Sequence, residues 1–189
     1  FETPDFETND IGRLTTGDGM LYNTEIEYRE TVPGSWFREY ALTVSQGQEW
    51  NFGGDLQRSD AGVEASVTWP NFWSTDWTTE FDFRRQDMRL TRGGPSMERP
   101  RAWRTGLEIE TSDASQTRGT TELLYGRSED GGLEFTAGAG VTMRPGPQWL
   151  FSINPTYERE VNTQQYVATR SGGGPATFGG RYIFGHIDR

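Results

Sequence analysis

The sequence predicts an all-β protein: an antiparallel up-and-down meander of about nine strands, forming part of a transmembrane outer-membrane β-barrel. Three observations favour this fold. Segments of about ten residues alternate apolar and polar side chains, tryptophans lie near their ends, and connections at the two ends differ in length. Because successive strand side chains point to opposite faces, each segment has one apolar and one polar face. The apolar faces contact either lipid, in a barrel, or the core of a soluble β-sandwich.

The alternation is regular through the middle of the chain. Apolar side chains of one parity recur in four segments: Val63, Ala65, Val67 and Trp69; Trp77, Phe81 and Phe83; Trp103, Leu107 and Ile109; and Leu133, Phe135, Ala137, Ala139, Val141 and Met143. Turn residues punctuate the pattern. Strands are expected at residues 20–29, 35–50, 55–69, 76–91, 102–111, 117–127, 132–143, 148–159 and from 180 onward. No helical pattern intervenes, so the sheet should be antiparallel.

The domain organisation is simple. Residues 1–19 form a polar lead-in, and residues 20–189 are expected to form one β-barrel segment that is incomplete at both ends. Bacterial barrels normally have an even number of strands, and the last expected strand has no closing partner.

The expected connections divide into two groups by length. In a meander, alternate turns lie at opposite ends of the sheet. The turns near residues 32, 71, 113 and 146 are short and share one end. The connections near residues 53, 94 and 130 and the segment 160–179 share the other end, and those near 94 and at 160–179 are longer. Short turns opposite longer loops are typical of outer-membrane barrels.

Tryptophan placement also favours a membrane. Aromatic side chains with a polar edge prefer the interface between lipid and water. The alternative is a sandwich core, where tryptophans should concentrate in the middle of strands. The expected interfacial girdle comprises Trp36, Trp50, Trp69, Trp77, Trp103 and Trp149.

Composition excludes several classes of function. The 189 residues carry a net charge of −10, which argues against a nucleic-acid partner. There is no cysteine, so disulfides and thiolate metal sites are impossible. The mean hydropathy of −0.78 is low for a chain in lipid. It keeps open the alternative of a soluble, secreted β-sandwich that binds glycans, with a core of Val63, Val67, Phe81, Leu107, Ile109 and Phe135.

The polar parity carries most of the charged strand residues. In a barrel they line the lumen, where opposite charges on neighbouring strands form ion pairs. This lining either favours cations and neutral polar solutes or has only a structural role. The candidate lumen residues are Glu64, Glu80, Asp82, Arg84, Arg104, Glu108, Glu110, Glu122, Glu134 and Glu158.

Enzyme chemistry is not favoured. The pair Glu108 and Glu110 has a spacing that a glycosidase could use, but acidic pairs two residues apart are common in strands. The only histidine, His186, shares its parity with aromatic residues and is expected to pack or lie at an interface. We therefore expect no catalytic residues, cofactor or metal.

One connection stands out as a candidate functional loop. Arg92, Gly93, Gly94 and Pro95 lie in the long connection near residue 94. They form either a turn that needs glycine at positive φ or a loop that folds inward and constricts a pore.

Several segments resemble one large, uncharacterised bacterial family. Its members have an N-terminal domain like carbohydrate-binding module family 9 and a C-terminal outer-membrane barrel. The resembling segments, in order, are Phe6–Gly12, Pro33–Arg38, Trp50–Gly54, Leu90–Met97 with Pro100 and Trp103, Thr111–Asp113 and Arg181–Asp188. The Leu-Thr-Arg-Gly-Gly-Pro motif is the most specific.

This resemblance implies fold and location, not a mechanism. It implies a Gram-negative outer-membrane protein that is a passive channel or a membrane anchor linked to carbohydrate handling. The expected partners are outer-membrane lipid, glycans or small polar solutes, and other envelope proteins.

Overall fold

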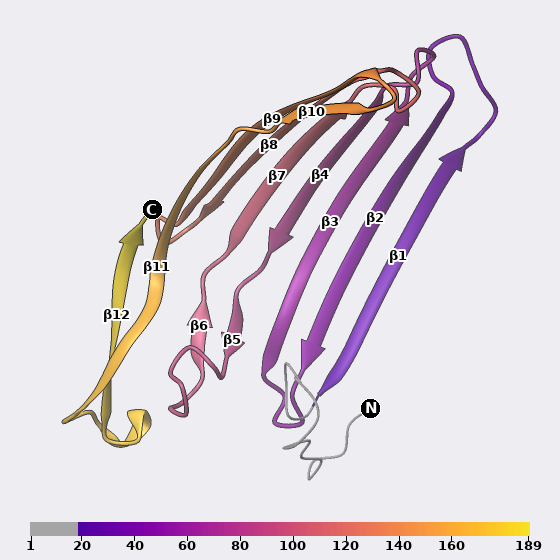
Figure 1. The fold of residues 1–189 in the computed structure, drawn as a ribbon. Coiled ribbons are helices and arrows are strands. Elements are labelled where there is room, and N and C mark those ends of the chain that lie inside the picture. Colours follow the sequence, from indigo (N-terminus) through magenta and orange to yellow (C-terminus); the bar gives the residue numbers. More distant parts are fainter. Residues whose placement is uncertain (1–18) are drawn as a thin grey trace.

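The computed structural model describes residues 19–189. The lead-in expected at residues 1–19 therefore lies, apart from Gly19, outside the described residues. The described chain is all-β (Figure 1). Its only helical element is the 3-10 turn Pro175–Thr177. The strands are β1 (Met20–Glu30), β2 (Glu39–Trp50), β3 (Leu56–Thr68), β4 (Ser74–Asp82), β5 (Arg85–Asp87), β6 (Met97–Arg99), β7 (Ala102–Glu110), β8 (Thr117–Ser128), β9 (Leu133–Gly146), β10 (Trp149–Ile153), β11 (Thr156–Ser171) and β12 (Gly180–Asp188).

The main sheet is an antiparallel meander of ten strands. Its order is β1-β2-β3-β4-β7-β8-β9-β11-β12, and β10 also pairs with β9. Strands β5 and β6 form a separate two-stranded sheet. The edge strands β1 and β12 do not pair with each other, so the described residues form an open sheet and not a closed barrel.

The strand register confirms the two faces that alternation predicts. Ile26, Val44 and Val63 are opposite one another on β1, β2 and β3. Trp77 on β4 is opposite Ala65 on β3 and Leu107 on β7. These rows continue to Leu123, Tyr125, Phe135 and Ala137. We call this side the apolar face. The opposite side, the polar face, bears Glu64, Glu80, Arg104, Glu122 and Glu134.

The described residues form no hydrophobic core. Leu90 is the one large apolar residue in residues 19–189 that is buried, with 7% exposure. The core expected for a β-sandwich does not form, because those six residues are spread over one layer of sheet and none is buried. Phe81, for example, is 45% exposed. The sandwich prediction is wrong for this part of the chain.

Several strand boundaries differ from the sequence prediction. β2 begins at Glu39, and the strand expected at 148–159 is divided between β10 and the start of β11. The strand expected at 76–91 ends at Asp82, and β5 begins a separate hairpin at Arg85. The connection expected at 160–179 is mostly strand, because β11 continues to Ser171. Pairing of β11 with β12 shifts between Asn162 and Gln165 and again between Tyr166 and Ala168. Such bulges interrupt the two-residue period, so alternation could not reveal this strand.

The structure confirms which connections share an end of the sheet, but it does not confirm the predicted sorting of their lengths. One end of the sheet carries residues 31–38, 69–73 and 111–116, together with the turn between β9 and β10. The other end carries 51–55, 83–101, 129–132 and 172–179. Both ends therefore have short and medium connections, and residues 83–101 alone are much longer. We call these two ends the turn end and the loop end.

Candidate functional site

The polar face gathers most of the lumen candidates on one surface. Glu80, Arg104 and Glu134 occupy one row across β4, β7, β8 and β9, with Gly126 between the last two. Glu64 and Glu158 lie in the neighbouring row, and Glu108 and Glu122 in the next. Two of the expected residues, Asp82 and Arg84, are at or beyond the end of β4. The candidate site is therefore this face, together with the loop end.

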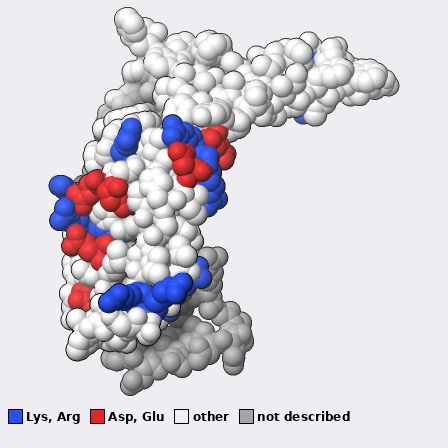
Figure 2. Space-filling view, turned by 90° about the vertical axis from the view of Figure 1, so that its left-hand side faces the viewer, with Lys and Arg blue, Asp and Glu red and all other residues white. Residues whose placement is uncertain are grey.

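Charges on the polar face are paired unevenly. Arg104 on β7 binds Glu80 on β4, with an Nη2–Oε2 distance of 2.5 Å, as the expected cross-strand pairing requires. Asp76, Glu108 and Glu122 lie directly opposite one another on β4, β7 and β8, and no arginine bridges them in the described part of the chain. Figure 2 shows acidic and basic side chains intermixed over part of one surface and almost absent from the projecting part. The polar face therefore combines the Arg104–Glu80 ion pair with an acidic row that lies nearer the turn end.

Glycines make room for side chains on the polar face. A Cβ at Gly62 would lie 2.9 Å from the hydroxyl of Ser45, and a Cβ at Gly106 would lie 2.8 Å from that of Thr78. Real Cβ atoms do not approach so closely. These two positions are glycine because polar side chains of the adjacent strands occupy the space beside them.

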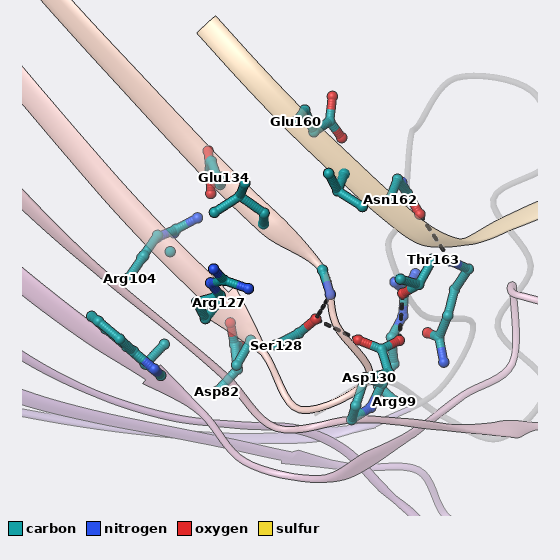
Figure 3. Close-up of a pocket in the computed structure, with 18 of the residues that line it drawn as sticks. Asp82, Arg99, Arg104, Arg127, Ser128, Asp130, Glu134, Glu160, Asn162 and Thr163 are labelled. Atoms are coloured by element: carbon teal, nitrogen blue, oxygen red, sulfur yellow. Dashed lines mark hydrogen bonds between the residues drawn. The ribbon is translucent and has the colours of Figure 1, made fainter. Parts of the chain in front are cut away.

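A cavity of about 350 Å³ lies at the loop end, between the polar face and residues 83–101 (Figure 3). Asp130, from the β8–β9 turn, accepts hydrogen bonds from the hydroxyls of Ser128 and Thr163, the second at 2.5 Å. Burial raises the pKa of Asp130, but these hydrogen bonds outweigh it and hold the pKa below its usual value. The other polar lining includes Asp82, Arg85, Arg99, Arg104, Glu134, Glu160, Asn162 and Gln164.

Glu129 is the electrostatic centre of the loop end. Its carboxylate accepts from Nε of Arg84 at 2.7 Å, and from Nε of Arg101 at 3.1 Å. It also accepts from the backbone N–H of Arg101 at 3.2 Å. The hydrogen bond from Arg84 is the largest contribution, and together these contacts lower the pKa of Glu129 to about 2. Glu129 therefore stays ionised over the physiological pH range and ties together both ends of residues 83–101.

The expected loop residues lie at the tip of the same segment. Arg92 and Gly93 have positive φ angles of 51° and 98°, which confirms the turn that requires left-handed backbone. The guanidinium of Arg92 lies 5.0 Å from the centre of the Tyr166 ring on β11. Gly94 packs against Tyr182 on β12 so closely that a Cβ would overlap the tyrosine ring. The loop tip therefore reaches strands that are distant from β4 and β7 in the sheet order.

Six of the seven tryptophans lie near strand ends. Trp36, Trp69 and Trp73 are in or beside turn-end connections, and Trp149 begins β10 there. Trp50 ends β2 and Trp103 is the second residue of β7, both at the loop end. The sequence predicts that Trp77 lies at the start of its strand, but β4 starts at Ser74 and Trp77 is its fourth residue. Its indole N–H donates to the hydroxyl of Thr105 at 3.0 Å, so this polar group is satisfied within the apolar face.

Three other features that could carry function are the histidine, a metal site and a membrane-spanning helix. His186 is exposed on β12, and the nearby carboxylate of Asp188 accepts a hydrogen bond from Arg159 at 2.9 Å. No group of three or more potential ligands in residues 19–189 is placed to hold a metal ion. Within the same residues, no helix has the length and apolar character needed to cross a membrane.

Sequence reasoning missed three residues that organise the site. Asp76 completes the acidic row, and its position on the polar parity of β4 was a usable signal. Glu129 and Arg101 had no such signal, because both lie in connections where strand periodicity says nothing about side-chain direction.

Fold and site together define an all-β protein: a single-layer antiparallel meander with one apolar face, one polar face and a structured long connection. The chain belongs to the family described as a domain of unknown function (DUF5916), whose model matches residues 1–188. No curated protein and no solved structure matches it.

Proposed function

We propose that this chain forms part of the wall of a Gram-negative outer-membrane β-barrel, with the apolar face in lipid and the polar face lining a water-filled passage. The observation that carries the proposal is an extensive apolar face that nothing in residues 19–189 covers. Ile26, Val44 and Leu123 are 69%, 49% and 44% exposed. Soluble monomers rarely expose contiguous apolar patches of this extent.

The distribution of charge supports lipid as the cover. On six neighbouring strands, β2 to β4 and β7 to β9, the apolar face carries one charged side chain, Arg127. Arg127 lies at the loop end, where its Nε donates to the hydroxyl of Tyr125 at 2.8 Å. A charge near the end of a membrane strand is tolerated far better than one at the bilayer midplane. Strand lengths of 9–14 residues also suit a spanning barrel strand.

The polar face supports passage of small polar solutes. The acidic row of Asp76, Glu108 and Glu122 favours cations and neutral solutes over anions. The resemblance to barrels that carry a carbohydrate-binding-like domain supports a link to carbohydrate handling, either as a channel or as a membrane anchor. We expect outer-membrane lipid to be the main partner and other envelope proteins to associate.

Site-directed quenching tests the orientation of the two faces. The full chain has no native cysteine, so a single fluorophore can be attached at Val63→Cys on the apolar face or at Glu64→Cys on the polar face. After reconstitution into vesicles, a nitroxide lipid should quench the probe at residue 63. A water-soluble quencher should quench the probe at residue 64. Equal quenching of both probes from water would contradict the proposal.

A further inference from the structure

The long connection between β4 and β7 has more structure than its role as a linker requires. These two strands are neighbours in the sheet, so a short hairpin turn could join them. Residues 83–101 instead form a hairpin of their own, in which Gln86 of β5 is opposite Glu98 of β6. We call residues 83–101 the strap.

The base of the strap is fixed at several points. Both Arg84, at its start, and Arg101, at its end, bind the carboxylate of Glu129 in the β8–β9 turn. Backbone N–H of Phe83 donates to the carbonyl of Ser59 on β3 at 2.9 Å. Within the hairpin, Nε of Arg99 donates to Asp87 at 2.8 Å. The base is therefore held by hydrogen bonds to β3 on one side and to the β8–β9 turn on the other.

The tip of the strap is compact. Leu90 and Thr91 are 7% and 3% exposed, in a chain with almost no other buried side chains in its described part. The hydroxyl of Thr91 donates to the carbonyl of Pro95 at 2.8 Å and closes the tip on itself. A segment that is tied internally and buried in this way has a defined shape and does not behave as a mobile loop.

The tip contacts β11 and β12, two strands that are distant from β4 in the sheet order. Gly94 packs on the ring of Tyr182 of β12, and Arg92 lies over the ring of Tyr166 of β11. In the sheet order, β7, β8 and β9 separate β4 from β11. Figure 1 shows the β5–β6 hairpin and the β11–β12 hairpin projecting toward the same end of the molecule. The strap therefore connects the β4–β7 part of the sheet with strands β11 and β12.

The strap also borders the polar face. Its residues Arg85 and Arg99 line the same cavity as Arg104, Glu134 and Glu160 of β7, β9 and β11. A solute that moves along the polar face toward the loop end meets this cavity and then the strap.

We propose that the strap is a fixed constriction, latched by the contact of Gly94 with Tyr182, that limits the size of solutes passing along the polar face. This inference rests on the proposed passage, but the latch itself can be tested without transport. Glycine is required at residue 94 because any side chain would displace the Tyr182 ring. Loss of the tyrosine ring therefore removes the latch and leaves the base of the strap intact.

Cross-linking tests the latch. The test must keep Gly94 and Tyr182 unchanged, because their contact is the latch. Arg92→Cys with Tyr166→Cys places two thiols beside it, since the Arg92 guanidinium lies 5.0 Å from the centre of the Tyr166 ring, and a thiol cross-linker with a flexible spacer joins them. Thr142→Cys with Ser152→Cys is the positive control for a close pair on the polar face, because these hydroxyls lie 3.1 Å apart. In full-length protein in membranes, both pairs should link in most molecules. Adding Tyr182→Ala should abolish most of the 92–166 linking and leave the control pair linked. A linked control with an unlinked 92–166 pair, or a 92–166 yield that Tyr182→Ala does not change, would overturn the latch.

Permeation tests the constriction. Tyr182→Ala should raise the rate at which oligosaccharides enter proteoliposomes several-fold and change monosaccharide entry less than twofold. Tyr157→Ala, which removes a 60% exposed ring on β11 remote from the strap, is the matched control and should change neither rate. Equal rates in Tyr182→Ala and the control would overturn the size limit. No permeation by any variant would overturn the proposed passage and the size limit together, whereas the cross-link would still report the position of the strap.

Discussion

Replacing Leu107 by arginine separates a lipid-facing sheet from one that faces water. Leu107 is near the middle of β7, five residues after its first residue and three before its last, and lies between Trp77 on β4 and Leu123 on β8. The neighbouring residue, Glu108, is on the opposite face between Asp76 and Glu122. The same substitution at these adjacent positions therefore places one new charge on each face of a single strand.

An arginine should change the free energy of unfolding by different amounts on the two faces. Arginine near the bilayer midplane on a lipid-facing strand costs about 2–4 kcal/mol. That cost lowers the folding equilibrium constant roughly 30- to 1,000-fold, at about 1.4 kcal/mol per tenfold. Glu108→Arg instead places a positive charge between two carboxylates, so it should be neutral or stabilising. On a water-exposed face, Leu107→Arg would change the free energy of unfolding by only about 0.5 kcal/mol.

Folding of the full chain into lipid vesicles, titrated with urea, measures both variants under one set of conditions. We expect a large loss for Leu107→Arg and none for Glu108→Arg. The reasoning is refuted if Leu107→Arg costs less than about 0.5 kcal/mol, or if the two variants lose the same amount.

Three further predictions follow from single contacts. Glu129 has a pKa of about 2, below its usual 4.5. Its stabilising contribution is therefore complete above pH 4.5 and is lost as the pH falls toward 2. Hydrogen-exchange rates of residues 83–101 should differ between wild type and Glu129→Gln at pH 7 and become equal near pH 2. Gly140→Ala should lower the free energy of unfolding by about 1–3 kcal/mol in a urea titration. The new Cβ would overlap the Thr120 hydroxyl and lie 2.6 Å from Oδ1 of Asn154. Gly146→Ala is the control and should be neutral, because a Cβ at residue 146 would have no neighbouring atom within 4 Å. Thr105→Val leaves the indole N–H of Trp77 without its acceptor and should cost about 1–3 kcal/mol; an unchanged urea midpoint would show that another acceptor replaces it.

Alternation predicted the sheet because it reports a property of every regular strand. The four central segments that begin at Val63, Trp77, Trp103 and Leu133 all have the expected apolar faces, and their rows align across the sheet. This success needs only the two-residue period and no knowledge of the partner strands. The cross-strand pair of Arg104 with Glu80 followed from the same pattern.

The pattern failed where the backbone departs from a regular ladder. Bulges in β11 shift the pairing after Asn162, so the sequence predicts a connection where the structure has a strand. The sequence also does not predict the contacts of the strap, because Gly94 and Tyr182 are far apart in sequence and meet only when the sheet has formed. Closure of the sheet could not be read from the pattern either, because alternation is the same in an open sheet and in a barrel.

The two faces of this single layer require different surroundings. Asp76, Glu108 and Glu122 are side by side, and no arginine of residues 19–189 pairs with them. This arrangement is tolerable only where water screens the repulsion. On the other side of the same strands, Trp77, Leu107 and Leu123 form an apolar row, and the indole N–H of Trp77 finds its acceptor within the sheet. Water alone would leave the apolar row exposed, and an apolar medium alone would surround the carboxylates. A sheet with water on one side and lipid on the other satisfies both faces, and for this reason we favour a membrane wall over any fully immersed arrangement of the described residues.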